Sequence, residues 1–198
     1  MTRTIDRFRT SLRTLRRARR HRGDLAGWLV RRPQLAASVL TFETALLLSN
    51  RVDPHLKELA ELKTAALVNC EFCLDIGSAL AHSAGVTEQQ IADLPRYRTS
   101  PAFDEVEKLV LAFAEAVTTT PAVGIDDLRE QLVTRLGRTQ VAELAVAISW
   151  ENQRARLNQA LGVRPTGMAE GMACALPEAA GRAAEPARDL PITLDTGN

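Results

Sequence analysis

Two cysteines three residues apart, in the segment Cys70-Glu71-Phe72-Cys73, are the residues best suited to chemistry. A helical pattern breaks at Asn69-Cys70, so we expect the pair to lie on one face of the first turn of a new helix, where it can close a reversible disulfide. Free backbone amides and the positive end of the helix dipole lower the pKa of a thiol at such a position. Because the thiolate is the nucleophilic form of cysteine, the spacing favours redox chemistry.

Three other interpretations of the pair stay open. A zinc site needs about four ligands, and it would have to recruit His55, His82 and Cys174 at irregular spacing. A pair of inert core cysteines is the second, because cysteine is among the residue types most often buried. A thioredoxin-like fold is the third, but it requires a βαβ context, against which the helical pattern argues. We expect no metal and no organic cofactor.

The elements that position the cysteines are expected to be helices, because the alternation typical of strands is nearly absent. Asp53-Pro54 is typical of a helix start, and Thr87 with Gln90 forms a capping box. A further helix is expected to begin at Ser100-Pro101, and Thr139 to cap the last one. Together these signals predict helices over roughly 34–48, 54–68, 70–84, 87–94, 101–118, 125–136 and 139–161.

The composition argues against several classes of protein. Of the 198 residues, 45% are hydrophobic and 25% charged, as in a soluble globular chain. A net charge of +1 argues against a globally basic nucleic-acid-binding protein. No apolar run reaches the roughly 18–20 residues of a membrane span, and none follows the basic N-terminus, so we expect no membrane anchor and no secretory signal. Three cysteines that include one CxxC pair fit a reducing compartment, so we expect a cytoplasmic protein.

The two ends of the chain differ from its middle. Residues 1–23 carry nine Arg and one Asp, and because the total charge is +1 the remainder sums to −7. Ile5, Phe8, Leu12 and Leu15 recur there at helical spacing. They predict an amphipathic helix that either packs its apolar stripe on the body or contacts nucleic acid or an anionic membrane.

The segment from residue 163 onward has no aromatic residue, four Pro and four Gly, so we expect a mobile tail. Residues 191–194, Pro-Ile-Thr-Leu, are its candidate for docking on the body. The chain is therefore divided into a basic N-terminal helical arm (1–32), a helical domain (33–162) and a C-terminal tail (163–198).

A longer motif surrounds the cysteine pair. The segment Leu56-Lys57-Glu58-Leu59, then Lys63, then residues 69–77 (Asn-Cys-Glu-Phe-Cys-Leu-Asp-Ile-Gly), resembles the core of the alkylhydroperoxidase D-like / carboxymuconolactone decarboxylase-like family. The redox motif of that family is a Glu, eleven residues, Cys-x-x-Cys, three residues and a His, and Glu58 lies twelve positions before Cys70, as the motif asks. Residues 148–162 resemble the closing helix of many members, so the resemblance covers roughly 34–162.

This resemblance implies an all-α, alkylhydroperoxidase D-like fold of about six or seven helices, assembled as a dimer, trimer or hexamer. It also implies a cysteine-based peroxidase or thiol–disulfide oxidoreductase. Cys73 would attack a hydroperoxide and become a sulfenic acid, and Cys70 would resolve it to a disulfide. Glu58 would be the general base, and a thioredoxin-like or lipoyl-bearing dithiol protein would be the reductant. From the residues alone, the favoured interpretation of Glu58 is a solvated helix residue paired with Lys57 or Lys63.

One position departs from the motif, since Gly77 stands where the family has its His. His82 cannot take over by simple helical geometry, because it lies nine residues from Cys73, about 13–14 Å along a continuous helix. Asp75 is two residues from Cys73 and points elsewhere. Cys174 is interpreted as an incidental exposed thiol.

Two rival functions stay open beside the peroxidase. One is a decarboxylase or isomerase on a small lactone acid, as in relatives that are not defined by a CxxC. The other is a non-catalytic or redox-sensing helical oligomer that uses its basic arm on DNA. A polar belt in the last helix, which includes Glu151-Arg154 and Asn152-Arg156 pairs and Asn158, is either a solvated face or a network near the cysteines or a subunit interface.

Overall fold

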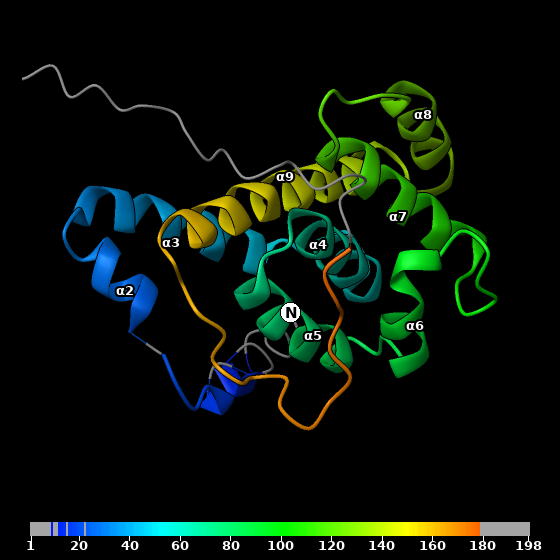
Figure 1. Ribbon diagram of the computed structural model, residues 1–198. Helices are drawn as coiled ribbons and strands as arrows, with labels where there is room; N and C mark the ends of the chain where they lie inside the picture. Colours follow the sequence, from blue (N-terminus) through cyan, green and yellow to red (C-terminus); the bar gives the residue numbers. More distant parts are fainter. Residues whose placement is uncertain (1–8, 10–11, 15, 22, 179–198) are drawn as a thin grey trace, which may run out of the picture.

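The computed structural model describes residues 9, 12–14, 16–21 and 23–178. Every regular element in these residues is a helix (Figure 1). Seven α-helices and one 3-10 helix lie within residues 33–162, all of which are described, so the predicted all-α domain is confirmed. The elements are α2 (Asp24–Leu29), α3 (Pro33–Leu48), α4 (Pro54–Val68), α5 (Glu71–Ser83), α6 (Glu88–Asp93), η1 (Leu94–Arg96), α7 (Glu105–Thr118), α8 (Ile125–Leu136) and α9 (Arg138–Ala160).

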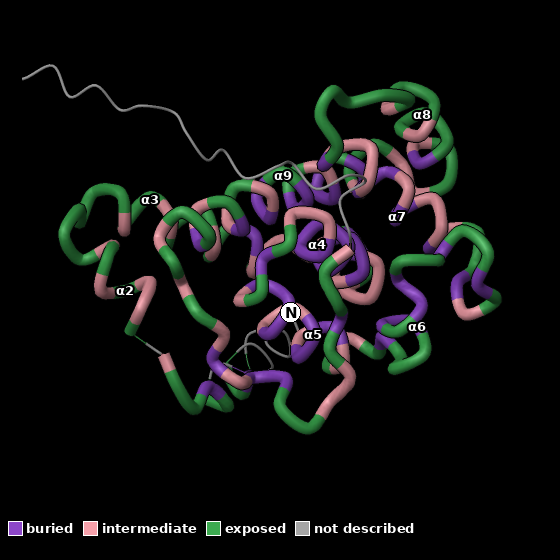
Figure 2. The backbone as a smooth tube through the Cα atoms, viewed as in Figure 1, coloured by how far each residue is buried: buried purple, intermediate pink, exposed green. Residues whose placement is uncertain are grey.

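Helix α4 is the centre of the domain, where it packs against α5, α7 and α9 (Figure 1). Two buried apolar clusters meet on it. Leu59 and Leu62 join the cluster shared with α5 and η1, whereas Ala60 joins the cluster shared with α7, α8 and α9. Burial is accordingly densest along α4 and α5, and α8 is largely exposed at the edge (Figure 2).

The break before the cysteines forms as predicted. Asp53 begins α4 by accepting a hydrogen bond from the backbone N–H of His55 at 3.0 Å. Asn69 ends the helix in the left-handed conformation, with φ of 62°, which asparagine tolerates better than most residues. The chain therefore turns at Asn69 and enters α5 directly, with Cys70 at its N-cap.

Two predicted helix starts are wrong. The helix expected at Ser100 begins at Glu105, because Asp104 and Glu107 form a capping box there and the Ser100 hydroxyl instead donates to Asp93 at 2.6 Å. The pattern Asp-x-x-Glu at 104–107 was the signal for this start. The last helix begins at Arg138, directly after Gly137, so Thr139 lies inside α9 and is not its cap.

Residues 163–178, the described part of the segment expected to be a mobile tail, pack along α5. Thr166, Met168 and Ala175 are buried. The Asp75 carboxylate explains this order, since it accepts hydrogen bonds at 2.8–3.1 Å from the backbone N–H groups of Thr166, Gly167 and Ala169 and from the Thr166 hydroxyl. Burial opposes the charge of Asp75, but these backbone donors outweigh it and hold the pKa of Asp75 below its usual value. The docking candidate at 191–194 and the apolar residues Ile5, Phe8 and Leu15 lie outside the described residues.

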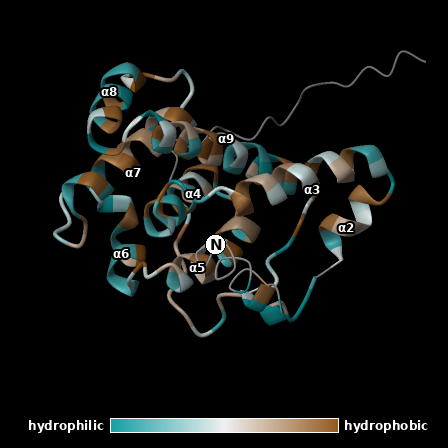
Figure 3. Ribbon diagram, turned by 180° about the vertical axis from the view of Figure 1, so that it is seen from behind, coloured by the Kyte–Doolittle hydropathy of each residue, from teal (hydrophilic) through white to brown (hydrophobic). Residues whose placement is uncertain are grey.

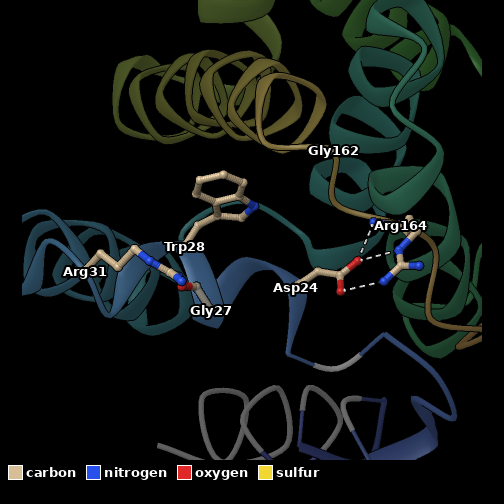
Figure 4. A pocket seen from close by; sticks show the side chains of 6 residues that line it. All are labelled: Asp24, Gly27, Trp28, Arg31, Gly162 and Arg164. Atoms are coloured by element: carbon tan, nitrogen blue, oxygen red, sulfur yellow. Dashed lines mark hydrogen bonds and ion pairs between the residues drawn. The ribbon is translucent and has the colours of Figure 1, made fainter.

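Helices α2 and α3 form an arm beside α9 that includes hydrophobic residues (Figure 3). Several of these residues are exposed. Contacts from both helices hold the arm. The Arg164 guanidinium donates to both oxygens of Asp24 at 2.8 and 3.0 Å (Figure 4), and Phe42 stacks on Trp150 of α9 with ring centroids 3.9 Å apart. Among the described residues, no helix is both long and apolar enough to cross a membrane.

Candidate active site

Cys70 and Cys73 form a disulfide on the first turn of α5. Their Cα atoms are 5.2 Å apart, and both residues are at least 98% buried. The Cys70 sulfur also accepts a hydrogen bond from the backbone N–H of Cys73 at 3.2 Å, because Cys70 occupies the N-cap position of the helix. The cap therefore stabilises negative charge on Cys70 whenever the disulfide is reduced.

Cys73, but not Cys70, lines a cavity of about 470 Å³. The cavity lies between α3, α4, α5 and α9 and is mostly apolar. Glu58 lines the same cavity, so the structure brings two of the three predicted site residues to one space, whereas Cys70 is not among the residues that line it. Its lining residues are Leu25, Val39, Leu40, Glu43, Thr44, Leu47, Glu58, Glu61, Phe72, Cys73, Ile76, Gly77, Leu80, Trp150, Glu151, Gln153, Arg154, Leu157 and Asn158.

The end of α9 supports the cysteines. The buried side-chain amide of Asn158 lies 3.5 Å from the Cys73 sulfur, with Nδ2 as the donor. The neighbouring Gln159 donates to the carbonyls of Val68 and Asn69 at 2.8 and 2.9 Å, which holds the break between α4 and α5. Of the interpretations left open for the polar belt, a network near the cysteines is therefore the one that the structure favours.

Gly77 lines the cavity at the motif position that the family fills with His. A Cβ atom built there would come within 3.3 Å of the Leu62 methyl Cδ1, so the wall is already close-packed. His82, as expected, is elsewhere, and its Nε2 lies 3.0 Å from the carbonyl of Ala173. No group of three or more potential metal ligands occurs in the described part of the chain, so the zinc interpretation finds no support there. Cys174 is exposed and is the free cysteine of this part.

Arg154 joins three carboxylates in the wall of the cavity. Its guanidinium lies 3.0 Å from Glu43 of α3, 3.1 Å from Glu61 of α4 and 2.6 Å from Glu151 of α9. Glu43 also accepts a hydrogen bond from the Trp150 indole N–H at 2.9 Å. The Glu151–Arg154 pair and the Asn152–Arg156 contact, at 3.5 Å, confirm the predicted spacings. Sequence reasoning missed Glu43 and Glu61, which come from other helices.

Glu151 is the most deeply buried member of this cluster, with only 4% of its surface exposed. Its Oε2 accepts from Arg154, whereas its Oε1 has no hydrogen-bond partner among the described residues. Burial raises the pKa of Glu151 to about 7, against the lowering effect of Arg154, and the nearby Glu61 and Glu43 add to the rise.

The lysines near Glu58 in sequence have other partners. The Lys57 ammonium donates to Glu143 at 3.1 Å and to the carbonyl of Leu46 at 3.0 Å. Lys63 contacts both oxygens of Glu178 at 2.5 and 2.6 Å. Both lysines are buried. The Lys57 ammonium thus contacts Glu143 and the Lys63 ammonium contacts Glu178, whereas Glu58 lines the cavity with Cys73.

Comparison with known proteins places this chain in a family. Residues 33–116 match the model of the carboxymuconolactone decarboxylase family. YnjA, an uncharacterized protein of Escherichia coli (strain K12), is 33% identical over 128 residues, which cover 64% of this chain and 67% of that protein. The uncharacterized protein Rv2313c of Mycobacterium tuberculosis (strain ATCC 25618 / H37Rv) is 30% identical over 115 residues, or 58% of this chain and 40% of that protein. The uncharacterized protein YdfG of Bacillus subtilis (strain 168) is 27% identical over 109 residues, which cover 54% of this chain and 74% of that protein.

The chain belongs to the carboxymuconolactone decarboxylase family, which includes the alkylhydroperoxidase D-like proteins. The match covers less than half of the mycobacterial relative, so the rest of that protein has no counterpart in the alignment. No solved structure matches the chain significantly.

Proposed function

We propose that this protein is a cysteine-based peroxidase, a thiol–disulfide oxidoreductase that reduces organic hydroperoxides through Cys70 and Cys73. One observation carries the proposal: Cys73 lines an apolar cavity together with Glu58 and stands at disulfide distance from Cys70. Apolar walls suit the carbon chain of an organic hydroperoxide. A buried, paired cysteine behind the cavity suits the resolving step.

The proposed cycle starts from the dithiol. Glu58 takes the proton of the Cys73 thiol, and the thiolate attacks the distal oxygen of the hydroperoxide. The O–O bond breaks, the alcohol leaves with a proton, and Cys73 becomes a sulfenic acid. The Cys70 thiol then attacks the Cys73 sulfur, water leaves, and the Cys70–Cys73 disulfide forms. A thioredoxin-like or lipoyl-bearing dithiol protein returns two electrons and two protons in a reducing compartment such as the cytoplasm.

The helix cap fits the reductive half of this cycle. A reducing thiolate that enters through the cavity attacks Cys73, and Cys70 is then the leaving group. The Cys73 N–H that donates to the Cys70 sulfur at 3.2 Å stabilises the departing thiolate. The two cysteines therefore have different positions and different proposed roles.

The charge of the cavity argues against the rival enzyme, a decarboxylase or isomerase that acts on a small lactone acid. Four carboxylates line it, from Glu43, Glu58, Glu61 and Glu151, and Arg154 is the cation among its lining residues. A lactone acid is an anion at neutral pH and would be repelled there. The cavity therefore favours a hydroperoxide over the substrate of a carboxymuconolactone decarboxylase-type enzyme. The missing His at Gly77 favours a second candidate, a disulfide reductase or redox sensor that exchanges disulfides on the same fold without reducing peroxide.

We also propose a homo-oligomer that forms through the arm. Large apolar side chains on and beside α2 and α3 are more than half exposed, an arrangement typical of an interface. They are Trp28 at 51%, Val30 at 68%, Leu35 at 54%, Leu40 at 67% and Leu48 at 56%.

The test is peroxide consumption by the fully reduced protein, followed by intact-mass analysis, in a Cys174→Ser background. We expect stoichiometric consumption of cumene hydroperoxide and loss of two hydrogens from the parent protein. Cys70→Ser should accumulate a sulfenic acid on Cys73 that dimedone traps, and Cys73→Ser should consume no peroxide. If both thiols stay reduced in excess peroxide, yet exchange with a dithiol–disulfide partner, the proposed peroxidase function is wrong. The disulfide reductase is then the function that remains.

A further inference from the structure

The cavity holds a buried polar atom without a partner. Glu151 is one of the residues that line the cavity, and its Oε1 is enclosed and has no hydrogen-bond partner in the described part of the chain. Leaving a buried polar atom unpaired costs about 1–3 kcal/mol, so such an atom calls for an explanation. One explanation is a ligand that supplies the missing hydrogen-bond partner.

The charges around Glu151 decide whether Oε1 accepts or donates. Arg154 lies within contact distance of three carboxylates, those of Glu43, Glu61 and Glu151. One positive charge does not balance three neighbouring carboxylates, and burial favours the neutral form most strongly for the carboxyl that is least exposed to water. Glu151 is the most buried of the three, with 5% of its side chain exposed against 35% for Glu43 and 16% for Glu61.

The position of the proton on a neutral Glu151 follows from the hydrogen bonds. Arg154 donates to Glu151 Oε2 through Nε at 2.7 Å, so the proton belongs on Oε1. Protonated Oε1 is a hydroxyl donor that lacks an acceptor, and a rise in the pKa of Glu151 to about 7 agrees with this state. What the site lacks is an oxygen that can accept a hydrogen bond.

The spacing of two residues along α9 indicates how long a ligand must be to reach from Cys73 to Glu151. Glu151 and Asn158 are seven residues apart in α9, about two turns or roughly 10 Å along the helix axis, and lie on the same face. Asn158 contacts the Cys73 sulfur, and apolar residues such as Leu157 and Ile76 line the cavity. A molecule that reaches from Cys73 to Glu151 is therefore elongated and apolar along its length.

We propose that the cavity binds an elongated, uncharged organic molecule whose carbonyl or hydroxyl oxygen accepts a hydrogen bond from Glu151 Oε1, about two helical turns from the Cys73 sulfur. Anionic molecules are excluded, because the carboxylates of Glu43, Glu58 and Glu61 face the same space with one arginine between them. That the far end of the molecule is a hydroperoxide rests on the proposed function, whereas the binding mode does not.

The binding test uses the oxidised protein, in which Cys70 and Cys73 are joined and do not titrate. The chain has two tryptophans, so Trp28→Phe leaves Trp150, which lines the cavity, as the fluorescent reporter. Octanamide, octanoate and octylammonium form a matched series of neutral, anionic and cationic probes of similar shape. Each is titrated at about pH 6 and about pH 8.5, on either side of the pKa of Glu151.

We expect saturable binding of octanamide at the lower pH and about tenfold or more weaker binding at the higher pH, because Oε1 loses its proton. Octanoate should not bind at either pH. In Glu151→Gln the side-chain N–H donates from the same position without a titrating proton, so octanamide should bind equally at both pH values. Glu43, Glu58, Glu61 and Arg154 also face this space and are unchanged in that variant, which separates the titration of Glu151 from theirs.

Three results would overturn the inference. They are octanoate binding as tight as that of octanamide, octanamide binding that does not change with pH in the parent protein, and preferential binding of octylammonium. The parent protein alone gives all three readouts, so the test does not depend on the variant folding. If octanamide binds but peroxide is not consumed, the proposed reaction is wrong and the binding mode stands. If peroxide is consumed but octanamide does not bind, the binding mode is wrong and the proposed reaction stands.

Discussion

The side-chain amide of Asn158 lies 3.5 Å from the sulfur of Cys73, although 85 residues separate them in the chain. An amide N–H donates a hydrogen bond but is too weak an acid to transfer its proton to a thiolate, so this contact favours the charged form of the sulfur. Asn158 is buried, and a charge-assisted hydrogen bond in such a place is worth about 1.5–3 kcal/mol. The contact therefore positions and stabilises the proposed nucleophile.

Replacing Asn158 by Ala should lower the reactivity of Cys73. In a background with Cys70→Ser and Cys174→Ser, we expect the rate of Cys73 alkylation by iodoacetamide at neutral pH to fall about tenfold or more, the equivalent of the lost hydrogen bond. The pH at which alkylation is half-maximal should rise. Asn152→Ala is the control, because Asn152 lies on the same helix and donates to Thr118 at 3.0 Å instead. Equal rates in both variants would show that Asn158 only packs.

Gly77 gives a gain-of-function prediction. Gly77→His returns the side chain that the family motif carries to the wall of the same cavity as Cys73 and Glu58. The new Cβ meets one flexible methyl, that of Leu62 at 3.3 Å, so the helix can accommodate it with a small shift. We expect peroxide reduction to become about tenfold or more faster, the effect of adding a positioned acid–base group.

Gly77→Leu is the matched control, since it fills similar space without a proton to exchange. We expect it to leave peroxide reduction unchanged or slower. Stopped-flow measurement of peroxide-driven oxidation at several pH values compares the variants. If His and Leu at this position have the same effect, the change is one of packing, and the introduced His does not act as an acid–base group.

How much of this site could be predicted from sequence depends on the distance between the partners along the chain. The start of α4 at Asp53-Pro54, the break at Asn69 and the Cys70–Cys73 pair depend on neighbouring residues, and their prediction is confirmed. Arg154 was expected to meet Glu151 because the two lie three residues apart on one helix.

The other partners of Arg154 were not predictable from spacing along one helix. Glu43 and Glu61 reach Arg154 across 111 and 93 residues, and α3 and α4 must pack beside α9 before these side chains meet. Asp75 shows the same limit, because its donors lie 91–94 residues away in a segment that composition alone marks as a tail. The pattern of neighbouring residues predicts where the helices begin and end, whereas these contacts between distant residues depend on tertiary packing.

Asp75 should be a stability determinant. Asp75→Asn replaces one acceptor oxygen by an N–H group that faces backbone donors, so we expect a loss of about 1–3 kcal/mol in the free energy of unfolding. Urea unfolding measures this loss, and hydrogen exchange should quicken at residues 166–169. Glu170→Gln is the control, because Glu170 lies in the same segment and makes only exposed ion pairs with Arg19 and Arg20.

The pH dependence of this contribution has a definite sign. Since the folded-state pKa of Asp75 is below its unfolded value, its stabilisation is fully present above the unfolded pKa. It is lost as the pH falls through the folded-state pKa. The stability difference between the parent protein and Asp75→Asn should therefore shrink in acid. A difference that stays constant from neutral pH to about pH 2 would show that the charge of Asp75 is not involved.

The arm of α2 and α3 should be where copies of the chain meet. Leu35 and Leu48 are 54% and 56% exposed at the two ends of α3, and neither lines the cavity, so their substitution leaves the proposed site intact. We expect the double variant Leu35→Asp, Leu48→Asp to sediment as a monomer at concentrations where the parent protein is an oligomer, because two charges would be buried in an apolar interface. Analytical ultracentrifugation checks this.

Val123→Asp is the control for that experiment, because Val123 is 75% exposed in the connection between α7 and α8. These two helices lie on the opposite side of the domain from α2 and α3 (Figure 1). An unchanged oligomer in this variant, together with a monomer in the double variant, assigns the interface to α3. A parent protein that is monomeric at all accessible concentrations would contradict the proposed assembly. The exposed leucines would then need another partner, such as the dithiol protein that reduces Cys73.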